Sequence, residues 1–408
     1  MKTDLEIEGS IQEPKATADG AADATRCVHA GEDRHGLASS ITTSTVQTSV
    51  FVLQNVEELR RISEGKSAAY MYSRYANPTT RAAEEKIAAL EGAADCVVTS
   101  SGMSAALAIL LASCKAGDEI VSMQDIYGGT VHLFNKVFSR FGVTTRFVPF
   151  QEIDRAERYF SDHTAVLFLE SPTNPTLRCV DIARLADLGK RRGVKMVVDN
   201  TFATPMLQKP LQLGADVSYH SATKFLGGHS DLTAGAVCGS KEFIQHAREM
   251  MILSGGCLDP SASYLLIRGL KTLALRMERA CHNAARVAEC LSQNSKVARV
   301  MYPGLRDDPA HEIARAQMNG FGTLVTIEVH GGGFAAERFI DGLRLWYLAT
   351  SLGGVESTVS YPILSSHAGM SQEQLRLMDV SPATVRLSVG VEGADDLIED
   401  LEQSLARC

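Results

Sequence analysis

Residues 195–201, Lys195-Met-Val-Val-Asp-Asn-Thr201, and residues 221–225, Ser221-Ala-Thr-Lys-Phe225, decide the fold and locate its functional end. The first stretch is a short apolar run that ends in the carboxylate of Asp199, and the second carries Lys224. In an α/β sheet, ligands bind beyond the carboxyl ends of the strands. A carboxylate at the end of an apolar strand therefore predicts a ligand site at that edge of the sheet.

The surrounding sequence alternates apolar runs with helical patterns. Continuous apolar strands that alternate with helices indicate a mostly parallel sheet covered on both faces. The pattern changes near residue 265, which predicts a large α/β domain over residues 80–265 and a smaller α+β domain over residues 266–408. The predicted strands are 96–98, 119–121, 165–169, 194–198 and 322–329, and the predicted helices are 82–90, 104–113, 182–192, 262–292 and 395–405.

Composition narrows the class of protein. The 408 residues are 45% hydrophobic and 22% charged, as in ordinary globular proteins, and this length favours two packed domains. The net charge is −8 and the basic residues are scattered, so we expect no nucleic-acid partner. No apolar run approaches the roughly 20 residues that cross a bilayer, so we expect no membrane segment and a cytoplasmic protein.

The N-terminal 25 residues are acidic and poor in apolar side chains. Such a stretch buries too little surface to order itself, so residues 1–25 are predicted to be a disordered leader. Transit peptides are Arg-rich and poor in acidic residues, which argues against one here.

Nine cysteines show neither a CxxC pair nor a Cys/His cluster. An odd count in a long chain favours reduced thiols over a disulfide framework, and we expect no metal site. Cys257, in a Gly-Gly-Cys-Leu-Asp-Pro turn, is the cysteine to examine as a nucleophile.

Asp199 and Lys224 together suggest pyridoxal 5′-phosphate chemistry. A carboxylate can pair with the protonated pyridine nitrogen of that cofactor, whose ring then withdraws electrons from a substrate carbanion. A partly desolvated lysine has a lowered pKa and is nucleophilic, so Lys224 would attach the cofactor as a Schiff base. The plain alternative, a helix cap and a surface lysine, explains each residue singly but not their combination.

A phosphate group would need further partners. Ser221 and Thr223 flank the lysine with hydroxyls, and the turn Thr99-Ser-Ser-Gly-Met-Ser-Ala105 leads from a strand into a helix. Backbone N–H groups at a helix N-terminus favour an anion, so Gly102 and Met103 are candidate phosphate contacts. Such turns are common, which makes this pattern weak when taken alone.

Three further candidate site residues lie between the predicted helices and strands, namely Tyr72, Arg74 and Tyr127. Arg74, in Tyr72-Ser-Arg74, has the planar fork that suits phosphate, although an interface ion pair would explain it equally well. Tyr127 follows a strand and precedes a helix, so its ring could stack on a flat cofactor. The alternative for Tyr127 is a core aromatic.

From about Thr25 to the C-terminus, the chain resembles the Cys/Met-metabolism enzymes of the pyridoxal-phosphate aspartate-aminotransferase fold (fold type I). This is the group of cystathionine γ-synthase, cystathionine γ-lyase and methionine γ-lyase. The resemblance rests on Tyr72-Ser-Arg74, Asn77-Pro-Thr79, Ser101-Gly-Met103, Tyr127-Gly-Gly-Thr130, Glu170-Ser-Pro-Thr-Asn-Pro175, Val198-Asp-Asn-Thr201, Ser221-Ala-Thr-Lys224, Arg268-Gly-Leu-Lys-Thr272, Ser351-Leu-Gly-Gly354 and Val385-Arg-Leu-Ser-Val-Gly390.

The resemblance implies further roles. Tyr72 and Arg74 would reach the cofactor phosphate of a neighbouring subunit, within an arm over residues 26–79, so the active form would be a dimer or, more usually, a tetramer. Asn174 would lie near the ring hydroxyl of the cofactor. Ser351 and Arg386 would hold the α-carboxylate of an amino-acid substrate, and Tyr127 would move protons together with Lys224.

Four positions bear on the substrate. In enzymes that cleave cystathionine, acidic residues are expected just before the Tyr-Ser-Arg and Ser-Leu-Gly stretches, where this chain has Met71 and Thr350. A distal ammonium would lose its charged partners there. Methionine γ-lyases usually carry a cysteine at the position of Gly129, and the β-elimination branch usually carries tryptophan at the position of Leu352.

We therefore expect γ-elimination or γ-replacement on homocysteine, methionine or an O-acylhomoserine. A cystathionine γ-lyase or γ-synthase is the alternative, and γ-replacement with a carbon nucleophile is a further one. A catalytically idle binding or regulatory subunit would be expected to lack Lys224, Asp199 or Arg386, and all three are present.

Overall fold

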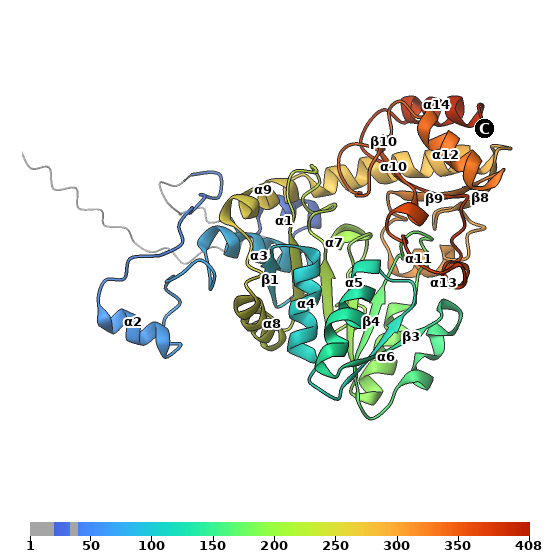
Figure 1. Cartoon of the computed structure of the whole chain (residues 1–408). Coiled ribbons are helices and arrows are strands. Elements are labelled where there is room, and N and C mark those ends of the chain that lie inside the picture. The colour runs from blue at the N-terminus through green and yellow to red at the C-terminus, as the bar shows by residue number, and fades with distance from the viewer. Residues whose placement is uncertain (1–19, 33–39) are drawn as a thin grey trace, which may run out of the picture.

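The computed structural model of the chain describes residues 20–32 and 40–408. Figure 1 shows a large domain built on one sheet and a smaller C-terminal domain built on another, with the long helix α10 (Leu273–Ser292) running between them. Within the described residues, no helix is both long and apolar enough to cross a membrane.

The large sheet has seven strands and is mostly parallel, because β2 to β6 run in one direction and only β7 pairs antiparallel with its neighbours. The apolar runs predicted at 96–98, 119–121, 165–169 and 194–198 became the strands β1, β2, β4 and β5. The strands β3, β6 and β7 were not predicted. The order is β1 (Asp95–Thr99), β7 (Gly235–Gly239), β6 (Val217–His220), β5 (Lys195–Asp199), β4 (Thr164–Glu170), β2 (Glu119–Met123) and β3 (Thr144–Val148).

Helices cover both faces of this sheet, as the continuous apolar strands predicted. Successive strand residues point to opposite faces, so Val97 packs in one core and its neighbours Cys96 and Val98 pack in the other. One face carries α4 (Gly102–Ser113), α6 (Ile182–Arg192) and α8 (Lys241–Ser254), and the other carries α3 (Pro78–Glu91), α9 (Pro260–Leu270) and the start of α10. The α/β prediction is confirmed.

The smaller sheet has five strands, with helices on one face and the large domain facing the other. Thr326 on β9 donates a hydrogen bond of 2.6 Å to the carbonyl of Pro175, which ties the two domains together. The strand order is β10 (Tyr347–Leu348), β11 (Thr358–Ser360), β12 (Thr384–Ser388), β9 (Leu324–Val329) and β8 (Val297–Met301), and the covering helices are α10, α12 (Gly332–Gly342) and α14 (Ala394–Leu405).

The remaining α-helices are short. Figure 1 shows α2 apart from the body of the molecule, on the segment that precedes α3. These helices are α1 (Asp23–His29), α2 (Val56–Ser63), α5 (Gly128–His132), α7 (Thr204–Leu207), α11 (His311–Gln317) and α13 (Gln372–Leu377).

Two sequence-based expectations need correction. The single helix predicted over 262–292 is two helices, α9 and α10, and at the break the Gly269 carbonyl accepts from the Thr272 amide (3.2 Å) and from the Arg276 side chain (2.8 Å). Helix α1 begins at Asp23, inside the predicted leader, where Lys209 pairs with Asp23 at 2.8 Å. Residues 1–19 of that leader lie outside the described residues.

All nine cysteines are free, as predicted. Cys257 is half-buried, and its backbone forms an isolated bridge with Thr99.

Candidate active site

Three polar side chains stand in a row where adjacent parallel strands end. Glu170 closes β4, its register partner Asp199 closes β5, and Tyr219 on β6 pairs with Asp199 in turn. All three are almost fully buried. The sequence placed Asp199 at this edge, whereas the row itself depends on the register between strands that are distant in the chain.

Burial raises the pKa of Asp199, although hydrogen bonds from Thr201 and Tyr219 oppose that shift. The Thr201 amide donates to Asp199 Oδ1 at 3.0 Å. Burial, and the charge of Asp199 next to it, raise the pKa of Glu170 well above its ordinary value. A cationic ring nitrogen beside Asp199 would stabilise the ionised carboxylate, because an opposite charge favours the charged form.

Lys224 follows β6 and projects into a buried space between the two domains. Burial and the nearby Arg386 lower the pKa of its amine to about 8. Its Nζ donates to Ser351 Oγ at 2.7 Å. A lysine that loses its charge this easily is a competent nucleophile near neutral pH.

The start of α4 lies against the segment that leads to Lys224. A Cβ atom on Gly102 would come within 2.8 Å of the Ser221 Cβ, so only glycine allows this approach. The Ser101 side chain caps the helix by accepting from the Ser104 amide at 3.1 Å. The Thr223 hydroxyl is already engaged with the Ala234 backbone, at 3.0 and 3.2 Å. An anion here would meet free N–H groups at the N-terminus of a twelve-residue helix.

At the other side of the cavity, Arg386 on β12 faces the large domain. Its Nη1 donates to Asn174 Oδ1 at 2.7 Å, and its Nε is buried without a hydrogen-bond partner. Burial lowers the pKa of Arg386 to about 10, and Glu170 opposes this shift. A buried guanidinium with an unused donor suits a carboxylate ligand.

Glu170 has a structural function that sequence analysis missed. Its carboxylate accepts from the Tyr127 amide at 2.7 Å and from the Asn174 amide at 3.1 Å. It therefore fixes the backbone of two predicted site residues at once. The only sequence signal was its place in the Glu170-to-Pro175 stretch, which suggested no such bridge.

These groups surround one cavity of about 240 Å³. Ser351 does not line it but reaches it through the hydrogen bond with Lys224. Thr130, Thr233 and Ser366 also line the cavity, although the sequence did not single out their side chains. The predicted site residues that line it are Gly102, Met103, Tyr127, Asn174, Asp199, Ser221, Thr223, Lys224 and Arg386.

Tyr72 and Arg74 lie away from this cavity within the same chain. Arg74 donates to the Ile252 carbonyl at 2.9 Å, and its guanidinium lies 4.8 Å from the centre of the Tyr75 ring. Their predicted contact with a neighbouring subunit stays a prediction.

Of the positions that bear on substrate choice, Thr350 and Leu352 line the cavity, whereas Met71 and Gly129 do not. The side of the cavity that Thr350 and Leu352 form therefore carries no charge from these two residues. Tyr127 is 46% exposed and lines the cavity too, so it is not the core aromatic of the alternative interpretation. A Cβ on Gly129 would come within 2.4 Å of the Tyr127 ring, so a larger residue there would displace that ring.

The chemistry of the cavity fits pyridoxal phosphate at three points. Lys224 supplies a buried amine with a lowered pKa, Asp199 supplies a buried carboxylate, and the α4 N-terminus with the Gly102 approach supplies an anion site. The unpartnered Nε of Arg386 leaves a donor for the carboxylate of a substrate. The fold and the site together define a pyridoxal-phosphate-dependent enzyme of fold type I.

Comparison with known proteins gives the same class. Residues 24–406 match the family model described as "Cys/Met metabolism PLP-dependent enzyme". The chain is 41% identical over 388 residues to cystathionine gamma-synthase 1 of Arabidopsis thaliana, described as chloroplastic, covering 94% of this chain and 69% of that protein. It is 40% identical over 386 residues to L-methionine gamma-lyase of Fusobacterium nucleatum subsp. polymorphum, covering 94% and 98%.

A solved structure, of metB from Corynebacterium glutamicum, superposes with a TM-score of 0.88 at 38% identity, over 95% of this chain and 98% of that one. The chain belongs to the Cys/Met metabolism PLP-dependent enzymes. The predictions of an enzyme with this cofactor, and of a γ-elimination or γ-replacement class, are confirmed at this level.

Proposed function

We propose that this protein holds pyridoxal phosphate on Lys224 and catalyses γ-elimination or γ-replacement on an amino acid whose γ-substituent is small and uncharged. The observation that carries the proposal is the position of the buried Lys224 amine between Asp199 at the strand ends and Arg386 at the domain interface. When bound, the cofactor supplies an electron sink for charge that develops on the substrate carbon.

The substrate carboxylate would bind at the Arg386 end of the cavity. Arg386 already donates one N–H to Asn174 and keeps Nε free, and its partner Ser351 lies 2.7 Å from the lysine amine. A carboxylate held there would bring the α-carbon of the substrate next to Lys224. The Lys224 amine, with its pKa lowered to about 8, would then act as the base that removes the α-proton.

Tyr127 would stack on the ring and share in the proton transfers. Glu170 supports this role because it holds the Tyr127 backbone at 2.7 Å and so fixes the origin of the side chain. Gly129 supports it as well, since the ring occupies the space that a side chain at 129 would need.

The proposed substrates are homocysteine, methionine and O-acylhomoserines. Thr350 and Leu352 line the cavity, and neither offers a carboxylate to a distal ammonium. The alternative is a cystathionine γ-lyase or γ-synthase, which the cystathionine γ-synthase relative favours. γ-Replacement by a carbon nucleophile would use the same residues of this cavity.

We further propose a cytoplasmic homo-oligomer, a dimer or tetramer, in which Tyr72 and Arg74 complete the phosphate site of the neighbouring subunit. Two observations support this assignment: Tyr72 is 38% exposed, and neither residue lines the cavity of its own chain.

A substrate panel tests the proposal. The purified holoenzyme is incubated separately with methionine, homocysteine, cystathionine, and O-acetylhomoserine with a thiol, and the 2-oxo acid and any new amino acid are measured together. A 2-oxo acid from methionine or homocysteine identifies a γ-lyase. Turnover of only the ester with a nucleophile identifies a γ-synthase. Preference for cystathionine would support the cystathionine γ-lyase alternative, and a lack of turnover with all four substrates would overturn the proposed substrate class.

A further inference from the structure

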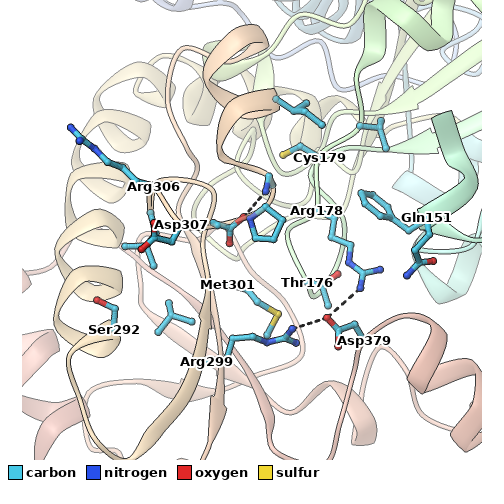
Figure 2. A pocket seen from close by; sticks show the side chains of 18 of the residues that line it. Gln151, Thr176, Arg178, Cys179, Ser292, Arg299, Met301, Arg306, Asp307 and Asp379 are labelled. Carbon is cyan, nitrogen blue, oxygen red and sulfur yellow. Dashed lines mark hydrogen bonds and ion pairs between the residues drawn. The ribbon is translucent and has the colours of Figure 1, made fainter.

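A cluster of charged side chains joins the two domains at a second cavity (Figure 2). Arg178, from the large domain, and Arg299, on β8 of the small domain, both contact one carboxylate oxygen of Asp379, at 3.2 and 2.8 Å. We call Arg178, Asp379 and Arg299 the interdomain clasp. The clasp forms part of the wall of this second cavity of about 750 Å³.

On the large-domain side, the clasp residue Arg178 is connected to residues of the active-site cavity through the chain and through a hydrogen bond. Arg178 lies four positions after Asn174, and its Nη1 donates to Asp125 Oδ2 at 3.0 Å. Asp125 is 1% exposed and lies two positions before Tyr127. Burial raises its pKa to about 6, and Arg178 opposes that rise. The same guanidinium lies 5.0 Å from the centre of the Phe150 ring.

On the small-domain side, the clasp residue Asp379 lies on the same chain segment as a residue that lines the active-site cavity. Asp379 follows α13, and the chain before that helix carries Ser366, which lines the active-site cavity, and His367, which is buried. The carbonyl of Ser366 lies where a Cβ on Gly128 would come within 2.8 Å, so the segment rests directly on the turn that follows Tyr127.

Asp379 is held in an uncommon backbone conformation. Its φ is +57°, in the left-handed region that non-glycine residues rarely adopt and that aspartate and asparagine tolerate better than most. Burial pushes its pKa up, but Arg299 and Arg178 outweigh burial and the net pKa is lowered. The Asp379 side chain is 45% exposed, and both cations contact it from within the clasp.

We propose that Arg178 is a positioning residue for substrate binding: through the interdomain clasp it holds segment 366–379 against the active-site cavity and keeps Arg386 facing Asn174. This inference rests on the substrate-carboxylate role proposed for Arg386. None of the clasp residues lines the active-site cavity, so the clasp would act through the segments that it joins.

The test compares holoenzyme variants Arg178→Gln, Asp379→Asn and the double variant. Asparagine keeps the size of the side chain and tolerates the left-handed φ, so Asp379→Asn removes only the charge. The matched control is Arg184→Gln, because Arg184 pairs with Asp154 at 3.5 Å on the same side of the large domain while both side chains are more than half exposed.

Two measurements are made on each variant: KM and kcat for whichever amino acid the wild type turns over, and amide hydrogen exchange of residues 366–378. We expect Arg178→Gln and Asp379→Asn each to raise KM about tenfold with a smaller change in kcat, and to speed exchange in the segment at least about tenfold. The double variant should resemble the stronger single variant, because both break one unit. Arg178→Lys should recover part of the loss.

The proposal is overturned if Asp379→Asn folds with wild-type KM and wild-type exchange, or if the two single effects simply multiply. Asp379→Gly, which also accepts the left-handed φ, replaces Asp379→Asn should the latter fail to fold. If the wild type turns over no amino acid, the proposed function fails, and hydrogen exchange alone still decides whether the clasp holds the segment.

Discussion

Burial and the neighbouring Arg386 lower the pKa of Lys224 to about 8, and this shift sets the chemistry of the cavity. A buried ammonium destabilises the fold, because desolvation penalises the charged form. The same environment that makes the amine nucleophilic therefore carries a stability cost in the cofactor-free protein.

Replacing Lys224 by methionine should raise the melting temperature of the cofactor-free protein at neutral pH. The folded pKa lies below the unfolded one, so wild-type stability rises with pH between about 8 and about 10 as the unfolded state holds the extra proton. The difference between variant and wild type should shrink over that window. Thermal unfolding at pH 7 and at about pH 10 measures it, and a difference that stays constant or grows contradicts the account.

Thr350 offers the sharpest test of substrate preference. Thr350→Glu would place a carboxylate on the cavity wall, where it could pair with a distal ammonium. We expect the ratio of kcat/KM for cystathionine to that for methionine to rise at least about tenfold, the effect of a single charge-assisted contact. Thr350→Gln, of similar size but neutral, is the control. An equal change in both variants would show that size rather than charge decides.

Single residues at strand ends were predictable, but the residues that orient them were not. Asp199 could be assigned because it ends an apolar run, and Lys224 because of its polar company. The role of Glu170 depends on two backbone amides 43 and 4 residues away along the chain. Local pattern holds no signal for such pairings.

At the scale of elements, helix α4 and the turn before it form the anion end of the site. Gly102 stands where a Cβ would come within 2.8 Å of Ser221. The helix was predicted to begin at residue 104, but it begins at Gly102, two residues earlier. Gly102 and Met103 have little helical pattern of their own, and the cap is made by Ser101.

Gly102→Ala should weaken cofactor binding by about tenfold, because the added methyl group either clashes with Ser221 or pushes the helix N-terminus off the phosphate. Titration of cofactor-free protein, followed by absorbance, gives the dissociation constant. Ser113→Ala, at the other end of α4, is the matched control and should bind as the wild type does. Equal affinity of the Gly102 variant and the wild type would remove α4 from the phosphate site.

The predicted and observed ends of the other helices show which boundaries the local sequence pattern can predict. Helix α6 matches its prediction, residues 182–192, since Asp181 caps one end and Gly193 the other. The break between α9 and α10 escaped prediction because it lies within an otherwise continuous helical pattern, where the hydrogen bond from the Arg276 side chain to the Gly269 carbonyl leaves no local signal.

At the scale of the whole molecule, the two-sheet architecture was predicted from the change of pattern near residue 265. The face-to-face placement of Arg386 and Asn174 was not, because it requires two domains to dock and the residues lie on opposite sides of that junction. The proposed role of Tyr72 and Arg74, which do not line the cavity of their own chain, likewise depends on another copy of the chain.

Mixing two inactive variants tests the shared site. If Arg74 serves the neighbouring subunit, a mixed dimer of Arg74→Ala and Lys224→Ala chains has one site with both defects and one intact site. Co-refolding the two should restore up to about a quarter of wild-type activity, as random pairing allows. Each variant refolded alone is the control. No recovery in verified mixed dimers would place Arg74 in its own subunit's site, and wild-type activity of Arg74→Ala refolded alone would show that Arg74 takes no part in catalysis or cofactor binding.

The central claim is that pyridoxal phosphate is attached at Lys224, and borohydride reduction of the holoenzyme tests it most directly. Reduction fixes the cofactor to its lysine, and peptide mass analysis then locates it. The account predicts the added mass on the peptide that contains Lys224 and its absence from Lys224→Ala protein. Reduced cofactor on another lysine, or none on a protein that absorbs as the holoenzyme, would contradict it.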